Sequence, residues 1–354
     1  MGTTPSFSWF PDSRRIAISL RSQQDGSSNL WIADTVTGRL TPLTTGVFNQ
    51  ADPAVSPTGR QILIREHADS FLIVSASLQG ASIRKWMSSQ RRVGMPAWSR
   101  KSERFVYATN RNGDSEIWLH ETDGSDRPLV TAAAFPPGST NSFMTPVLSP
   151  AEDRLAYRRI ATDGESVIWI SSLAGGPPVR LTTAKANERI GSWSPDGARF
   201  VYAYSAGGSG SLMICKTSGQ ATPVEFISGR GALPDWSPTG EWITVGGRSG
   251  WNLISPDGKS TRELGKIDSQ HLSFSKDGQT LYGIRAEGEH QYLFSLTLDG
   301  RMKTIGDVGA EFAPRSYLSP GVRFSVAPDG RSVLYPTYST KTSLWMLEGF
   351  GAPY

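Results

Sequence analysis

The sequence is short of the residues that build disulfides, metal sites and membrane spans. Its 354 residues include one cysteine, Cys215, so the chain can form no internal disulfide and no thiol-rich metal site. No apolar run approaches the roughly 18 residues that a membrane-spanning helix needs. The segment that follows Met1 is polar and lacks the apolar core of a signal peptide. These absences leave the cellular compartment open.

Concentrated charge and helical patterning are missing as well. The net charge is +4, and the basic residues are dispersed, with doublets such as Arg91-Arg92 and Arg158-Arg159 as the densest groups. Nucleic-acid binding requires a basic cluster, so we expect no nucleic-acid partner. No stretch keeps a helical period of apolar residues over three turns. The chain is therefore predicted to be all-β.

What the sequence does have is a five-residue motif that returns about every 45 residues, the repeat length of a propeller blade. Its fifth copy, Trp193-Ser194-Pro195-Asp196-Gly197, shows the full pattern, which we call the turn motif, with Trp193 as its anchor residue. The anchors of the eight copies, in order, are Trp9, Val55, Trp98, Leu148, Trp193, Trp236, Phe274 and Val326. Copies two, three, four and seven depart from the full pattern.

Each copy is followed by short alternating segments that predict one four-stranded blade. After the fifth copy come the apolar-rich strands 199–204, 211–215 and 223–227, separated by Gly- and Ser-containing turns. Most of the 11 tryptophans lie at an anchor or in a third strand, where they are expected to pack between blades. The prediction is a single β-propeller over 1–354 with eight blades, or alternatively seven, of mostly four antiparallel strands. The predicted blades are 6–46, 47–89, 90–133, 134–184, 185–229, 230–267, 268–309 and 310–354.

These residues resemble the TolB-like, or PD40, family of WD40-like propeller repeats, whose signature runs roughly W-S-P-D-G, then an apolar strand, then I-W or L-Y. The resemblance extends from Phe7 to Glu348. The ending Ser343 to Phe350 is similar to C-terminal propellers of bacterial multidomain sensors, kinases and regulators. The resemblance implies a sensor or scaffold module of a larger bacterial protein, and it favours a periplasmic or other extracytoplasmic location.

Closure of the ring presents a problem, because the last copy lacks an obvious fourth strand and Met1 to Pro5 is too short to supply one. A propeller avoids an exposed edge when one end of the chain completes the blade begun by the other. Two explanations are open: a three-stranded last blade, or an upstream segment that precedes Met1. The start in mid-repeat favours the second.

Catalytic signatures are weak. The string Gly207 to Ser211 lies between antiparallel strands and so does not fit a nucleophile elbow, which follows a parallel strand. His67 is expected in a hairpin loop, and the four histidines are too scattered to predict a metal site. The aspartates of the turn motif are expected to bond nearby backbone N–H groups. We therefore predict no catalytic residue, no metal and no cofactor, and an enzyme is not favoured.

The remaining place for function is the mouth of the central channel, at the starts of the inner strands. More arginines than carboxylates occur there, and Arg suits bidentate recognition of carboxylates. The candidate ligand-binding residues are Arg92, Arg189, Arg230, His271, Arg315 and Arg323. The predicted partner is a protein, a peptide or a small polar or anionic ligand, bound without membrane insertion. The alternatives are a channel-mouth lyase or hydrolase, and a water-filled channel with balanced charges.

Overall fold

The structure, a computed structural model, is built almost wholly of strands. It describes residues 6–350 apart from 23–26, 47, 137–141, 162–164, 183–186, 207–208, 219–223, 229–232, 248–249 and 310–322. The strands are β1 to β28, joined by one short 3-10 helix, η1 (Ala132–Ala134). Over the described residues, no helix has the length and apolarity to cross a lipid bilayer. The predicted all-β class is confirmed.

The turn motif recurs because its polar side chains close the hairpin between two strands. In the fifth copy it joins β16 (Asn187–Trp193) to β17 (Arg199–Ala206). The Ser194 hydroxyl accepts a hydrogen bond from the Arg199 N–H at 2.9 Å, and the Asp196 carboxylate accepts one from the Ala198 N–H at 3.0 Å. Gly197 adopts a φ of 69°, which favours glycine. This aspartate is a turn carboxylate, as expected, and its hydrogen bonds to Ser194 and Ala198 lower its pKa.

The chain gathers into two compact units rather than the single domain expected over 1–354. Unit 1 comprises residues 1–70, 111–113 and 339–354, and unit 2 comprises 71–110 and 114–338. Unit 2 has five antiparallel groups of consecutive strands, each of which we call a sheet; one parallel pair, Ser166 with Asn187, joins the second and third of them into an eight-stranded sheet. They are β8 (Val93–Trp98), β9 (Phe105–Asn112), β10 (Asp114–His120) and β11 (Asp126–Val130); β12 (Ser142–Leu148), β13 (Arg154–Ile160), β14 (Ser166–Ser172) and β15 (Val179–Arg180); β16, β17, β18 (Ser209–Lys216) and β19 (Val224–Ser228); β20 (Ile243–Gly247), β21 (Gly250–Ile254) and β22 (Thr261–Gly265); and β23 (Leu272–Phe274), β24 (Thr280–Glu287), β25 (His290–Thr297) and β26 (Met302–Gly309).

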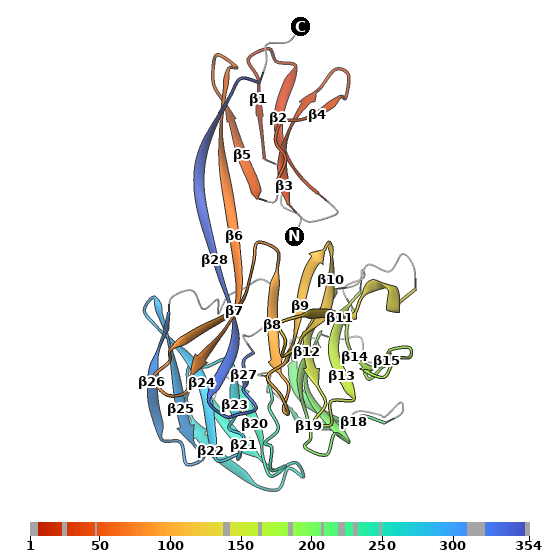
Figure 1. The fold of residues 1–354 in the computed structure, drawn as a ribbon, viewed down its shortest axis with the longest axis vertical. Coiled ribbons are helices and arrows are strands. Elements are labelled where there is room, and N and C mark those ends of the chain that lie inside the picture. Colours follow the sequence, from red (N-terminus) through yellow and green to blue (C-terminus); the bar gives the residue numbers. More distant parts are fainter. Residues whose placement is uncertain are drawn as a thin grey trace. The chain divides into compact units, whose positions relative to one another are not determined.

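A sixth sheet of unit 2 combines strands from both ends of the sequence. In it, β27 (Ser325–Val326) pairs with β28 (Ser332–Glu348), β28 lies beside β6 (Gln61–Ser77), and β6 pairs with β7 (Ile83–Ser89), as the blue and orange strands of Figure 1 show. The rings of Phe71 and Tyr338 meet across this junction, with centroids 5.0 Å apart. The strands that complete the last blade therefore come from β6 and β7, and neither explanation offered for the missing strand is needed.

Six apolar clusters, one between each pair of neighbouring sheets, close unit 2 into a ring. Each cluster takes residues from two successive sheets, such as Ile168 and Trp193 between β12–β15 and β16–β19. The other five follow in the same way around the ring, and the last joins β23–β26 to the sheet that contains β27. Anchors such as Trp193 and Trp236, each 1% exposed, fill these clusters as predicted. This arrangement is the propeller architecture.

Unit 1 has a smaller core. It holds the sheet of β1 (Phe7–Trp9), β2 (Arg15–Arg21), β3 (Ser28–Asp34) and β4 (Leu40–Pro42), together with β5 (Asn49–Val55) and parts of β6 and β28. Its single cluster is made of Phe10, Ala17, Leu30, Ile62 and Ile64. The eight copies of the motif thus lie in seven groups of strands, because the second and eighth copies share one sheet. Six of these groups contribute to unit 2.

The second copy departs furthest from the predicted blade 47–89. The sequence from Gln61 to Ser77 holds no Gly, Pro or Asn to form a turn, so it continues as one long strand, β6. His67 therefore lies within β6, paired with Asn49, and not in a hairpin loop as expected. The first part of β6 pairs with β5 and the last part with β7, which divides the residues of this copy between two units.

Candidate functional site

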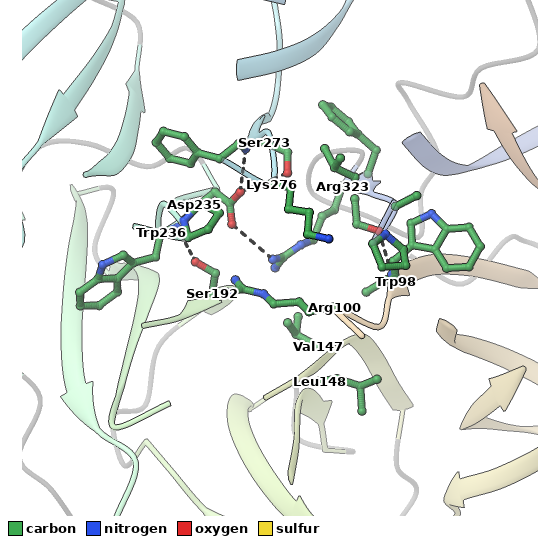
Figure 2. A pocket seen from close by; sticks show the side chains of 18 residues that line it. Trp98, Arg100, Val147, Leu148, Ser192, Asp235, Trp236, Ser273, Lys276 and Arg323 are labelled. Atoms are coloured by element: carbon green, nitrogen blue, oxygen red, sulfur yellow. Dashed lines mark hydrogen bonds and ion pairs between the residues drawn. The ribbon is translucent and has the colours of Figure 1, made fainter. Parts of the chain in front are cut away.

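A cavity of about 140 Å³ lies within unit 2, where the inner strands of all six sheets end. It is bounded by anchor residues of the turn motif and by the residues beside them (Figure 2). The polar and charged side chains among its walls are Arg100, Ser192, Asp235, Ser273, Lys276, Arg323 and Ser325. Apolar walls include Trp98, Val147 and Phe324. Side chains that are far apart in sequence thus share one cavity because each follows an inner strand.

Asp235 and Arg323 form the fixed charged pair of this cavity. Their side chains are 12% and 10% exposed, and a guanidinium nitrogen of Arg323 lies 4.0 Å from a carboxylate oxygen of Asp235. Asp235 also accepts hydrogen bonds from the Ser273 hydroxyl at 3.2 Å and from the Phe274 N–H at 3.3 Å. Burial lowers the pKa of Arg323, and the Asp235 carboxylate opposes that shift. The pair is therefore positioned by the surrounding backbone and not only by its own attraction.

Arg323 is also held by the backbone of the facing sheet. Its guanidinium donates a hydrogen bond to the carbonyl oxygen of Gly191, in the irregular part of β16. A Cβ at position 191 would lie 2.2 Å from the carbonyl oxygen of Val201, so only glycine fits there. The sequence places glycine at this bend of β16, and the bend presents the carbonyl that receives Arg323.

His271 packs behind the charged pair and is 1% exposed. Its ring meets the edge of Phe324 with centroids 5.0 Å apart, and neither ring nitrogen has a hydrogen-bond partner among the residues that the structure describes. Burial lowers the pKa of His271 to about 3, with Asp235 opposing the shift and Arg323 adding to it. The imidazole is therefore neutral near pH 7.

Two more cations, Arg100 and Lys276, reach the cavity from turns. Both occupy the third position of the turn motif, in the third and seventh copies, and both are accessible to solvent. Burial nevertheless lowers the pKa of Arg100, and the Asp235 carboxylate opposes that shift. Figure 2 shows the Arg100 guanidinium, the Lys276 ammonium group and the Arg323 guanidinium directed toward the middle of the cavity. The cavity thus holds three basic side chains and one carboxylate.

The structure brings only some of the six candidate residues from the sequence close to one another. Arg323 and His271 are neighbours beside Asp235. Arg189 lies on β16 next to Arg158, and Arg92 is an exposed residue just before β8; neither is among the residues that line the cavity. Arg230 and Arg315 lie outside the described residues. Arg100 and Lys276 were missed, although their signal was visible as two departures from proline in the turn motif.

Two other potentially reactive residues of unit 2, Cys215 and Ser209, lie in ordinary strand positions. Cys215 is 3% exposed in β18, and burial raises the pKa of its thiol to about 12. Ser209 begins β18 opposite Ala206, so it belongs to an antiparallel hairpin. In the part of the chain that the structure describes, no three His, Cys, Asp or Glu residues are grouped to hold a metal ion.

Ser273, His271 and Asp235 are the residue types of a nucleophilic triad, but their bonds differ from a triad's. The Ser273 hydroxyl donates to Asp235, and the His271 ring bonds to neither group. A triad requires the base to receive the proton of the nucleophile and to be oriented by the acid. As arranged, Ser273 and Asp235 position Arg323 and activate no nucleophile.

Comparisons with known proteins agree with this architecture. The structure is similar to that of a putative TolB from Agrobacterium tumefaciens, with a TM-score of 0.61 and 17% identity over 77% of this chain and 99% of the other. TolB from Acinetobacter baumannii gives a TM-score of 0.54 and 14% identity over 91% of this chain and 81% of the other. These likenesses show the fold.

A curated relative, the uncharacterized peptidase YuxL from Bacillus subtilis, is 25% identical over 206 residues, which are 56% of this chain. The match spans 29% of that relative's length. The TolB beta propeller domain family, PD40, matches residues 64–308, which is more than half of the chain. With the six sheets and their repeated turn motif, this match shows that the chain belongs to the PD40 family of TolB beta propeller domains.

Proposed function

We propose that this protein is a binding module that recognises a protein or peptide partner, or a small polar or anionic ligand, through the cavity of unit 2. The observation that carries the proposal is the Asp235–Arg323 pair. Its groups are held in place by Ser273, Phe274 and Gly191, and exposed basic side chains stand beside it. Preorganised polar groups in a concave, largely apolar site are typical of binding sites.

The cavity is small for an organic ligand of ordinary size. Sites for such ligands usually measure about 300–1,000 Å³, whereas this one measures about 140 Å³. It suits one side chain or one small polar group, with the rest of a partner lying outside. We further propose that the chain is a sensor or scaffold module of a larger bacterial protein; the larger protein, though not the sensor or scaffold role, is supported by the match to 29% of the length of the YuxL relative.

An enzyme is the second candidate, favoured by the peptidase name of the YuxL relative. Catalysis by Ser273 would require His271 to turn and bond the Ser273 hydroxyl, which now donates to Asp235. That rearrangement would place a base beside the nucleophile. The two candidates therefore differ in what loss of the Ser273 hydroxyl does to the protein.

One pair of assays separates them. The protein and its Ser273→Ala variant are incubated with acidic, basic and neutral peptides, and both thermal unfolding and peptide cleavage are followed. Binding predicts that at least one peptide class raises the apparent Tm, since a ligand at 100 times its Kd adds about 2.7 kcal/mol of stability, and that no cleavage occurs. Cleavage that Ser273→Ala abolishes would establish the enzyme instead, and a panel with no Tm shift would overturn the binding role.

A further inference from the structure

In four of the six copies that belong to unit 2, the third position of the turn motif lines the cavity. Proline occupies this position in six copies, at residues 11, 57, 150, 195, 238 and 328. Pro238 and Pro328 line the cavity, and so do Arg100 and Lys276, which hold the same position in the third and seventh copies. The third and seventh copies belong to the two sheets that flank the sheet of Pro328. These four residues therefore reach the cavity from four different sheets, whereas Pro150 and Pro195, at the same position, do not line it.

The turn itself does not need a basic residue there. In the seventh copy the Ser275 hydroxyl accepts a hydrogen bond from the Thr280 N–H at 2.9 Å and donates one to Asp277 at 2.6 Å. The fifth copy, which has proline, closes with the same bonds from Ser194 and Asp196. Because proline presets the backbone of such a turn, a long flexible cation is the less favourable choice for folding. Lys276 therefore contributes something other than the turn.

Arg100 and Lys276 differ in their partners from cations of unit 2 such as Arg104 and Arg180. Arg104 pairs with Glu152 at 2.5 Å, and Arg180 pairs with Glu165 at 2.8 Å. Across the described residues, neither Arg100 nor Lys276 has a carboxylate within ion-pair distance. The carboxylate of the cavity, Asp235, is already engaged by Arg323, Ser273 and the Phe274 N–H. The cavity therefore carries an excess of positive charge.

The surroundings strengthen the attraction of these cations for an anion. Trp98, Val147, Leu148 and Phe324 form apolar walls that exclude part of the solvent. In such a site electrostatic attraction is weakened less by water than it is on an open surface. The volume of about 140 Å³ matches a single small oxyanion better than it matches a cofactor.

From these observations we propose that the cavity selects an oxyanion, a carboxylate or a phosphate, bound between the Arg100 guanidinium and the Lys276 ammonium group. Arg100 supplies paired N–H donors that match two oxygens, and Lys276 supplies a point charge. The Asp235–Arg323 pair forms the wall behind the anion and does not bind it alone. This assignment rests on the binding role proposed above and names the chemistry that the partner presents.

The test restores the residue that the other copies carry. A double variant, Arg100→Pro with Lys276→Pro, is compared with the control Lys259→Gln, which removes an exposed charge in another turn that does not line the cavity. Inorganic phosphate and glutarate are titrated by calorimetry at constant ionic strength. The wild type and Lys259→Gln are expected to bind at least one of these anions, and the double variant at least tenfold more weakly. Equal binding by all three proteins would overturn the proposal.

The source of the oxyanion is decided in a second arm. One peptide is compared in three forms: with a free C-terminal carboxylate, with an amidated C-terminus, and amidated with a phosphoserine. Loss of binding on amidation identifies a carboxylate source, and its return with phosphoserine identifies phosphate. If a peptide from the earlier panel binds the double variant unchanged, the binding role stands and the oxyanion site is overturned. If the wild type binds the anions but binds no peptide, the oxyanion site stands and the peptide-binding role is overturned.

Discussion

The apolar clusters between the sheets of unit 2 differ from the cavity in the kind of residue that forms them and in whether that residue recurs from copy to copy. The clusters repeat: each pairs aromatic and aliphatic side chains from two successive sheets, with residues such as Phe294 and Tyr335 at 0% exposure. The charged pair of the cavity does not repeat, since the residues that correspond to Asp235 and Arg323 in the other copies are of other types. Apolar packing tolerates many residues of the right volume, whereas a buried charge requires a particular partner. Stability therefore depends on residues that the copies share, and the proposed binding specificity depends on residues that differ between them.

The largest effect is expected from a large-to-small change in a cluster. Phe294→Ala should cost about 3–5 kcal/mol, because it removes a fully buried ring and leaves a cavity beside Leu272 and Leu281. Val224→Ala is the matched control, since Val224 is 67% exposed and its loss should cost less than about 0.5 kcal/mol. Urea unfolding measures both. Similar losses for the two variants would contradict the assignment of stability to the clusters.

A second effect tests the cavity. Asp235→Ala should destabilise unit 2 by about 3 kcal/mol, because it leaves Arg323 without its carboxylate in a site where both side chains are largely buried. Arg301→Ala, which breaks the exposed pair with Asp299, should cost less than about 1 kcal/mol. The comparison is made by urea unfolding at one salt concentration. A small loss for Asp235→Ala would mean that water replaces the carboxylate.

The third effect is a dependence on pH that arises from His271. Its folded pKa of about 3 lies below the unfolded value of about 6.5. The unfolded chain therefore binds the proton more readily, and the stability due to neutral His271 is complete above pH 6.5 and is lost as the pH falls toward 3. Between pH 7 and pH 5 the loss should be about 2 kcal/mol. His271→Phe should remove this component of the unfolding profile; an unchanged profile would contradict it.

The smallest effect is a dependence of stability on pH with the opposite sign, and it arises from Glu188 on β16. Glu188 is 0% exposed on β16, and burial raises its pKa to about 7 although Thr182 and the Ile168 N–H bond its carboxyl. The stability due to protonated Glu188 is complete below the unfolded pKa of about 4.5 and is lost as the pH rises through 7. From pH 6 to pH 7 the loss should be about 1 kcal/mol. Glu188→Gln should be insensitive over this range, and a falling stability in that variant would exclude Glu188 as the cause.

Sequence patterns predicted the repeated parts of this fold and missed its exceptions. Trp193 and Trp236 were assigned to packing between blades because their spacing is regular, and both are buried there. The course of β6 and β28 was not predicted. A run without Gly, Pro or Asn is compatible with a long strand, but it does not show which strands that strand pairs with.

Of the six candidate residues, Arg323 lines the cavity and His271 packs behind it, and ligand binding by either of them stays a prediction. Arg323 and His271 were selected because they flank inner strands, and they meet beside Asp235. The pattern did not single out Arg100 and Lys276, because a turn motif predicts a structural role and a departure from proline does not by itself indicate a binding residue. Which side of a turn faces a channel depends on the twist of the sheet, and one sequence does not specify that direction.

The sheet of unit 2 that combines strands from both ends of the sequence, β6 and β28, also sets an order of events during synthesis. Phe71 and Ile73 on β6 emerge early, yet their partners Tyr338 and Leu334 on β28 emerge last. At about 5–20 residues per second, translation separates these partners by roughly 15–50 s. During that interval the apolar face of β6 awaits its cover, so a nascent chain of this kind has a defined window in which chaperones can act on it.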